Sequence, residues 1–113
     1  MSLIAASQGL GKTIDLTIED VDGVTITPGV HDKVRVTIGR LNETPVFTVT
    51  SGTATANGSS ITKGAANRLR LDASDLAEID PGIYSLQVDY YDNADAQEWK
   101  LVSVQVFSLE GSL

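Results

Sequence analysis

The stretch DPGIYSLQVDYY, Asp80–Tyr91, holds the strongest structural signal in the chain. Pro81 and Gly82 interrupt any regular element before them. Apolar and polar residues then alternate with a period of two, which is the pattern of a strand with one buried face. The apolar positions are Tyr84, Leu86, Val88 and Tyr90, and the polar ones are Ser85, Gln87, Asp89 and Tyr91. The stretch therefore predicts a half-buried β-strand that begins at a turn.

Similar alternation recurs through the rest of the chain. It is clear in KTIDLTIED (12–20), KVRVTIGR (33–40), NRLRLD (67–72) and QEWKLVSVQVFSL (97–109), and shorter in VTIT (24–27) and PVFTVT (45–50). Turn signals separate these segments, such as Asp22–Gly23 and Asn57–Gly58. SGTATANGSS (51–60) fits either a weak strand or a loop.

The return strand 97–109 has a break in its alternation. Val102, Val104 and Val106 share one parity, whereas Trp99 and Leu101 have the other. Either a β-bulge near residues 100–102 switches the faces, or both faces are covered at that end.

Only ASDLAEI (73–79) has helical character. Ser74 is a candidate N-cap, Asp75 and Glu78 follow it, and Pro81 ends the segment. One helical turn is all that this length supports.

About seven short strands and one helical turn predict an all-β fold, an antiparallel β-sandwich. We expect a flexible N-terminal arm over residues 1–12, the sandwich over 13–109 and a C-terminal tail over 110–113. At 113 residues, the chain has the length of one domain.

Composition narrows the classes of function. The chain has no cysteine, which excludes disulfides and thiolate chemistry, and its net charge of −7 disfavours nucleic acid as a partner. No apolar run is long enough to span a bilayer, and MSLIAAS lacks the basic region of a secretory signal. We expect a soluble protein made in the cytoplasm, with no membrane partner.

No motif in the sequence specifies a reaction. GLGKT (9–13) resembles part of a phosphate-binding loop, but Ala6 stands at the first glycine position and a strand pattern follows. The only histidine, His31, lies in a loop beside Asp32, and neighbours on an extended chain point to opposite sides. We therefore expect no enzymatic activity, no catalytic residue and no cofactor.

The acidic loops Glu19–Gly23 and Asp92–Asp95 contain oxygen ligands of the kind that calcium prefers, but neither has the spacing of a calcium loop. The sequons at Asn42 and Asn57 are expected to form turns. We predict no metal site.

The stretch Asp80–Leu86 resembles the tyrosine corner of immunoglobulin-like domains. Asp80, Gly82 and Tyr84 match an Asp-x-Gly-x-Tyr pattern, and Leu86 stands where those domains carry a cysteine. The resemblance implies that Tyr84 packs inward and bonds upstream backbone, and that packing of Leu86 replaces the disulfide. Because KVRVTIGR has no tryptophan, the antibody-type core is absent and only the general immunoglobulin-like sandwich is supported.

A second resemblance extends from about Asp15 to Leu109. The series VRVTIGR, ETPVFTVTSGTATANGSSIT and LRLDASDLAEIDPGIYSLQVDYYDNAD resembles small proteins encoded among bacteriophage and prophage structural genes, including immunoglobulin-like N-terminal modules of tail and baseplate proteins. Such modules mediate attachment within the virion and have no enzymatic activity. The resemblance implies a structural or accessory protein of the tail, baseplate, neck or capsid surface, assembled in the host cytoplasm. Its implied partners are other virion proteins and further copies of itself.

Two groups of residues are candidates for the interface. Ser2, Leu3 and Ile4 belong to the expected arm, and Tyr91 and Trp99 are aromatic anchors. Docking by strand addition at a sheet edge, or through a sheet face, suits a sandwich. The alternative is a carbohydrate- or host-surface-binding module in which Trp99 and Tyr91 form a sugar platform.

Overall fold

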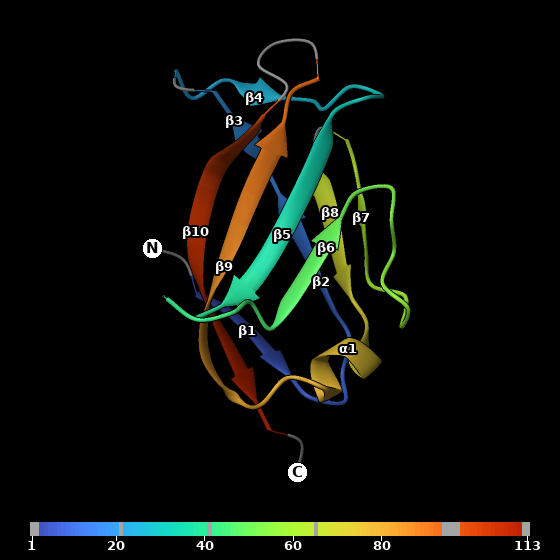
Figure 1. Cartoon of the computed structure of the whole chain (residues 1–113), viewed down its shortest axis with the longest axis vertical. Coiled ribbons are helices and arrows are strands. Elements are labelled where there is room, and N and C mark those ends of the chain that lie inside the picture. Colours follow the sequence, from blue (N-terminus) through green and yellow to red (C-terminus); the bar gives the residue numbers. More distant parts are fainter. Residues whose placement is uncertain (1–2, 21, 41, 65, 94–97, 112–113) are drawn as a thin grey trace.

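The computed structural model describes residues 3–20, 22–40, 42–64, 66–93 and 98–111. Within these ranges, the chain forms ten strands and one short helix (Figure 1). Two main sheets bury their inner faces against each other, so the fold is an all-β sandwich.

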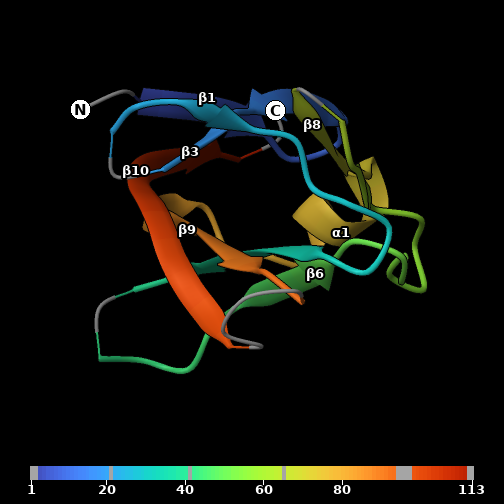
Figure 2. The ribbon, with the colours of Figure 1, turned by 90° about the horizontal axis from the view of Figure 1, so that it is seen from above.

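The larger sheet has five strands. Their order is β1 (Leu3–Ser7), β10 (Trp99–Glu110), β9 (Gly82–Tyr91), β5 (Lys33–Gly39) and β6 (Phe47–Thr50). β1 runs parallel to β10, and the other neighbours are antiparallel. Seen from above, β10 slants across one side of the molecule, between the layer of β5 and β6 and that of β1 and β8 (Figure 2).

The second sheet is β2 (Lys12–Leu16), β8 (Asn67–Leu71) and β7 (Ser60–Thr62), and it is antiparallel. A separate small hairpin joins β3 (Ile18–Glu19) to β4 (Thr25–Ile26). The alternating segment 12–20 is thus divided at Thr17, because its first part pairs with β8 and its second part with β4. Residues 51–59 form a loop, with a single bridge between Thr50 and Thr53.

The core follows the alternation of the sequence. The inward residues of β9 are buried as the period of two predicts, and so are those of β5 and β8. The largest fully buried side chains include Phe107, Ile38, Leu69 and Leu86. Burying one such side chain contributes roughly 1.5–3 kcal/mol to folding, so these two facing layers provide the main stabilisation.

The N-terminal segment differs from the prediction of a flexible arm over residues 1–12. Leu3–Ser7 form β1, Lys12 already belongs to β2, and Ala6 is buried in the core with Ile4 packed against it. The alternation is hard to see in LIAAS, because the small residues alanine and serine differ little in polarity. At the other end, Glu110 completes β10, and residues 112–113 of the expected tail lie outside the described residues.

Helix α1 (Ala73–Ala77) begins two residues earlier than predicted. The N-cap is Asp72 rather than Ser74, since the Asp72 carboxylate accepts a hydrogen bond from the Ser74 backbone N–H at 3.0 Å. Aspartate and serine are both good caps, so residue type alone does not choose between Asp72 and Ser74.

A β-bulge interrupts β10. Its register with β9 shifts between Leu101 and Ser103. Trp99 and Leu101 therefore point to the same side as Val104 and Val106, despite their different parity. That side is the outer face of the five-stranded sheet, because Phe107 and Leu109 occupy the core-facing positions.

Candidate functional site

The outer face of the five-stranded sheet carries apolar side chains where a solvent-facing sheet usually carries polar ones. Leu3 is 63% exposed, Ile83 62%, Leu101 60% and Val104 42%. These four residues and the half-buried Val106, which pairs with Leu3, form what we term the apolar strip. The register keeps them side by side along β10. Contiguous exposed apolar side chains are typical of a binding surface, whereas exposed apolar residues that are scattered singly are common on any protein.

Where β10 begins, the strip meets a group of aromatic and charged side chains. Trp99 pairs with Tyr91 across β10 and β9, and their ring centroids lie 5.5 Å apart. The Arg35 guanidinium lies 4.1 Å from the Trp99 ring centroid, and the Lys33 ammonium lies 5.3 Å from that of Tyr91. Such cation–π contacts hold the rings in place. With Asp89, these four residues are termed the Trp99 cluster.

Asp89 gives this cluster its charge balance. Its buried carboxylate lies 3.1 Å from Arg35 Nη2, and Gln87 Nε2 donates to both of its oxygens at 3.1 and 3.2 Å. A buried carboxylate without such partners would be strongly unfavourable. The Arg35–Asp89 pair therefore leaves the centre of this face without net negative charge.

The outer face of the three-stranded sheet has the opposite character. Its outward positions include Thr13, Asp15, Arg68 and Arg70, and Arg68 Nε donates to Asp15 Oδ1 at 3.1 Å. Both partners of this pair are exposed. The two faces of the sandwich are thus unequal, and only the five-stranded one has the composition of a docking surface.

The predicted interface residues are only partly brought together. Tyr91, Trp99 and Leu3 lie on the outer face of the five-stranded sheet, whereas Ile4 packs against the core and Ser2 lies outside the described residues. Sequence reasoning missed Ile83, Leu101 and Val104. The parity break in segment 97–109 was the available signal, because a bulge there brings its apolar residues to one face.

The predicted corner residues lie at the opposite end of β9. The Tyr84 hydroxyl donates to the Asp80 carbonyl oxygen at 2.5 Å, and the Arg40 guanidinium lies 4.6 Å from the Tyr84 ring centroid. Tyr84 and Leu86 are both buried. Gly82 leaves room for Arg40, since a Cβ there would approach Arg40 Nη2 to 2.6 Å. The corner fixes how the chain enters β9.

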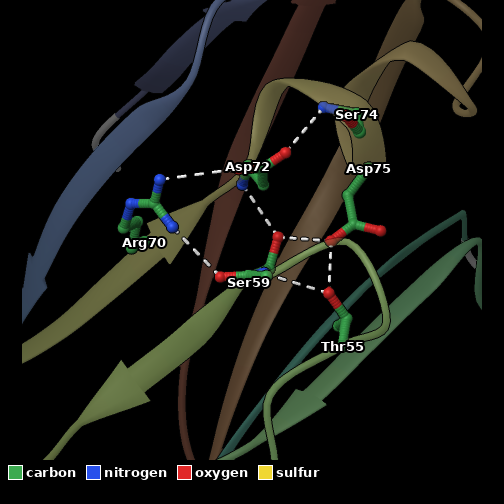
Figure 3. Close-up of polar contacts among 7 residues, drawn as sticks. Thr55, Ser59, Arg70, Asp72, Ser74 and Asp75 are labelled. Atoms are coloured by element: carbon green, nitrogen blue, oxygen red, sulfur yellow. Dashed lines mark hydrogen bonds and ion pairs between the residues drawn. The ribbon is translucent and has the colours of Figure 1, made fainter.

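A polar cluster around Asp75 ties the 51–59 loop to α1 (Figure 3). The Asp75 carboxylate accepts hydrogen bonds from Thr55 Oγ1 at 2.5 Å, from Asn57 Nδ2 at 3.0 Å and from the Ser59 hydroxyl. Ser59 Oγ in turn accepts from the Asp72 backbone N–H at 2.8 Å. Sequence reasoning placed Asp75 only as a first-turn acid, because its partners are 16 to 20 residues away.

These hydrogen bonds set the protonation of Asp75. Burial by itself raises the pKa of its carboxyl group, but the bonds from Ser59, Thr55 and Asn57 outweigh burial and lower the pKa below the usual 3.8. Ser59 is fully buried and its hydroxyl is engaged as both donor and acceptor. The cluster is therefore built to hold a loop in place.

A second polar cluster holds the loop before β5. Lys63 Nζ donates to the carbonyl oxygens of Gly29, Val30 and Asp32 at 2.8, 3.1 and 2.8 Å. The Asp32 carboxylate accepts from the Gly29 N–H at 2.7 Å, from the Tyr90 hydroxyl at 2.9 Å and from the Asn93 N–H at 3.0 Å.

The backbone N–H of Gly29 is the main reason that the pKa of Asp32 is lowered. Burial, followed by the bond to Asp32, raises the pKa of the Tyr90 hydroxyl. At neutral pH, the Asp32 carboxyl group therefore stays ionised and the Tyr90 hydroxyl stays protonated, as the hydrogen bond between them requires.

The weaker chemical motifs have ordinary places in the fold. Residues 9–11 of GLGKT lie in the link from β1 to β2, Lys12 starts a strand, and His31 is exposed. A pocket of about 470 Å³ opens between the β3–β4 hairpin and the start of β10, with Glu19, Asp20 and Asp92 in its lining. Within the described ranges, no group of three or more histidine, aspartate or glutamate residues is arranged to hold a metal ion. No described helix is long and apolar enough to cross a membrane.

Comparison with known proteins gives no family assignment. No protein-family model and no curated protein matches the chain.

Proposed function

We propose that the chain is a non-enzymatic structural or accessory protein of a bacteriophage virion, and that it acts by protein–protein docking. The observation that carries the docking role is the apolar strip beside the Trp99 cluster. Four exposed large apolar side chains on one sheet face are unfavourable in water unless a partner covers them. The virion as the setting follows from the sequence resemblance.

We further propose that the sandwich is of the immunoglobulin type. The order β1-β10-β9-β5-β6 in one sheet and β2-β8-β7 in the other supports it. Strands β5, β9 and β10 then correspond to the C, F and G strands of such domains, and β2, β8 and β7 to B, E and D. The Tyr84 hydroxyl bond to the Asp80 carbonyl at the start of β9 supports the same assignment.

The polar clusters favour a structural role over catalysis. Catalytic groups need a free donor or acceptor aimed at a substrate. Here the Asp75 and Asp32 carboxylates accept hydrogen bonds from loop residues, and Lys63 donates to three loop carbonyls. These groups serve the fold itself.

Proteomics of purified particles tests the virion role. Phage particles produced from cells that carry the gene should contain this protein at a fixed ratio to the major capsid protein. Replacing Leu101 by aspartate should lower that ratio, while the variant remains folded in the lysate. Particles that lack the wild-type protein would refute the virion role.

A carbohydrate-binding module remains the second candidate, because Trp99 and Tyr91 lie together on an outward face. Arg35 stacks over the Trp99 ring, which restricts the ring surface open to a sugar. Glycan-array binding that is lost in Trp99→Ala but kept in Leu101→Asp would favour this candidate over docking through the strip.

A further inference from the structure

We propose that the apolar strip docks a second copy of this chain, so that two copies associate side by side with strip against strip. The inference rests on the proposed docking role of this sheet face but not on residence in a virion. Such a contact is isologous, since the same surface of each copy faces the other across a two-fold axis.

Charge selects this face for self-association. The chain carries 15 acidic and 8 basic residues, so two copies repel each other over most of their surfaces. The outward positions of β5, of β9 and of β10 from Trp99 to Ser108 contain a single acid, Asp89, and Arg35 neutralises it. Lys33 adds a positive charge at the edge of this region. Two copies of this acidic chain can therefore approach each other at this face without bringing like charges into contact.

The two ends of the sandwich are poor alternatives. One end carries α1 and the other carries the β3–β4 hairpin (Figure 1). Acidic residues gather at both ends: Asp72, Asp75, Glu78 and Asp80 near α1, and Glu19, Asp20, Asp22 and Asp92 around the hairpin. End-to-end stacking of copies would bring these groups together, whereas side-by-side packing keeps them apart.

The size of the face fits a reversible dimer. β10 has 12 residues. With neighbouring strands, it offers a face of roughly 40 Å by 14 Å, or about 560 Å² per copy. Specific interfaces bury about 600–1,000 Å² per partner, so this face lies just below that range, where weak and transient contacts are found. We expect a dissociation constant on the order of micromolar rather than an obligate dimer.

The Trp99 cluster provides a pre-ordered anchor at one end of the strip. The Arg35 guanidinium over the Trp99 ring, and the tilted contact of the Tyr91 ring with it, fix these side chains before any partner arrives. Less side-chain entropy is then lost on docking. Aromatic residues and arginine held in this way are typical interface hot spots.

Sedimentation velocity of the purified full-length chain from about 1 to 500 μM tests the proposal. The wild type should shift from monomer to dimer over this range. Leu101→Asp should weaken association at least tenfold, because it would bury an unpaired charge on each side of the interface.

The matched control is Leu10→Asp, since Leu10 is 66% exposed but lies in the β1–β2 link, away from the strip. It should dimerise like the wild type, and circular dichroism should show that both variants are folded. A wild type that stays monomeric at 500 μM, or a Leu101→Asp variant that dimerises normally, would overturn the proposal. A dimer found in solution but absent from virions would refute only the proposed function.

Discussion

Tyr84 shows how one residue links local sequence to the whole sandwich. Its ring is buried in the core, and its hydroxyl reaches back across the turn to the Asp80 carbonyl. The chain has no cysteine and so no disulfide between the sheets, and this hydrogen bond helps to fix how the chain enters β9.

Replacing Tyr84 by phenylalanine removes that hydroxyl and leaves the Asp80 carbonyl without its donor. We expect the free energy of unfolding to fall by about 1 kcal/mol, measured by urea denaturation. Tyr91→Phe, on the outer face, is the control and should change stability by less than about 0.5 kcal/mol. Equal effects in the two variants would show that the corner bond adds nothing.

Asp75 makes stability depend on pH. Its pKa is lower in the folded protein than the ordinary 3.8, so the unfolded chain binds the proton more readily. The stabilising contribution is complete above about pH 5 and is lost as the pH falls through 3.8 and below. Asp32 contributes with the same sign.

Asp75→Asn should therefore lower stability at pH 7 by about 2 kcal/mol, because charged hydrogen bonds are lost, and should also flatten the decline between pH 5 and 3. Urea titrations across this pH range measure both effects. Asp22→Asn, in an exposed turn, should leave the profile unchanged. A variant profile parallel to that of the wild type would contradict the assignment.

At the level of elements, most strands could be predicted because one face of each is buried. Alternation identifies β5, β8 and β9 directly, since apolar and polar residues contrast at every step. β1 escaped prediction because its core-facing residues, Ile4 and Ala6, are flanked by small side chains. The division of segment 12–20 depends on strand partners that periodicity does not reveal.

Removing β1 tests whether the N-terminal segment is a stabilising strand or the flexible arm that the sequence predicts. Deleting residues 1–7 strips the edge of β10 and removes the packing of Ile4 and Ala6. We expect a loss of about 2–4 kcal/mol in the free energy of unfolding. Leu3→Ser, which changes only an exposed side chain of β1, is the matched control. A truncated chain with unchanged stability would mean that the segment behaves as an independent arm.

The candidate site forms only when strands from distant parts of the chain come together. Its residues come from four strands, and the bulge in β10 is needed to bring Leu101 and Val104 to one face. Sequence could indicate the aromatic pair and the parity break. It could not indicate Arg35 over Trp99 or the neutralisation of Asp89, because those contacts join residues more than 50 positions apart.

The distribution of charge predicts an unusual response to salt. Because each copy carries a net charge of −7 and the proposed contact is apolar, screening should favour association. Raising sodium chloride from about 20 to 300 mM shortens the Debye length from about 20 Å to about 6 Å. This change should lower the dissociation constant of the dimer several-fold. Sedimentation at both salt concentrations measures it. Weaker association at high salt would indicate an interface held by ion pairs instead.

Lys63 offers a chemical probe of these loops. Its ammonium group donates to three backbone carbonyls, so all of its hydrogens are occupied while the loop before β5 keeps its shape. An acylating reagent needs the nitrogen lone pair, which the amine can offer only after it leaves these three carbonyls and loses a proton to solvent. The rate of acylation at Lys63, relative to the exposed Lys100, therefore reports how often that end of the sandwich opens.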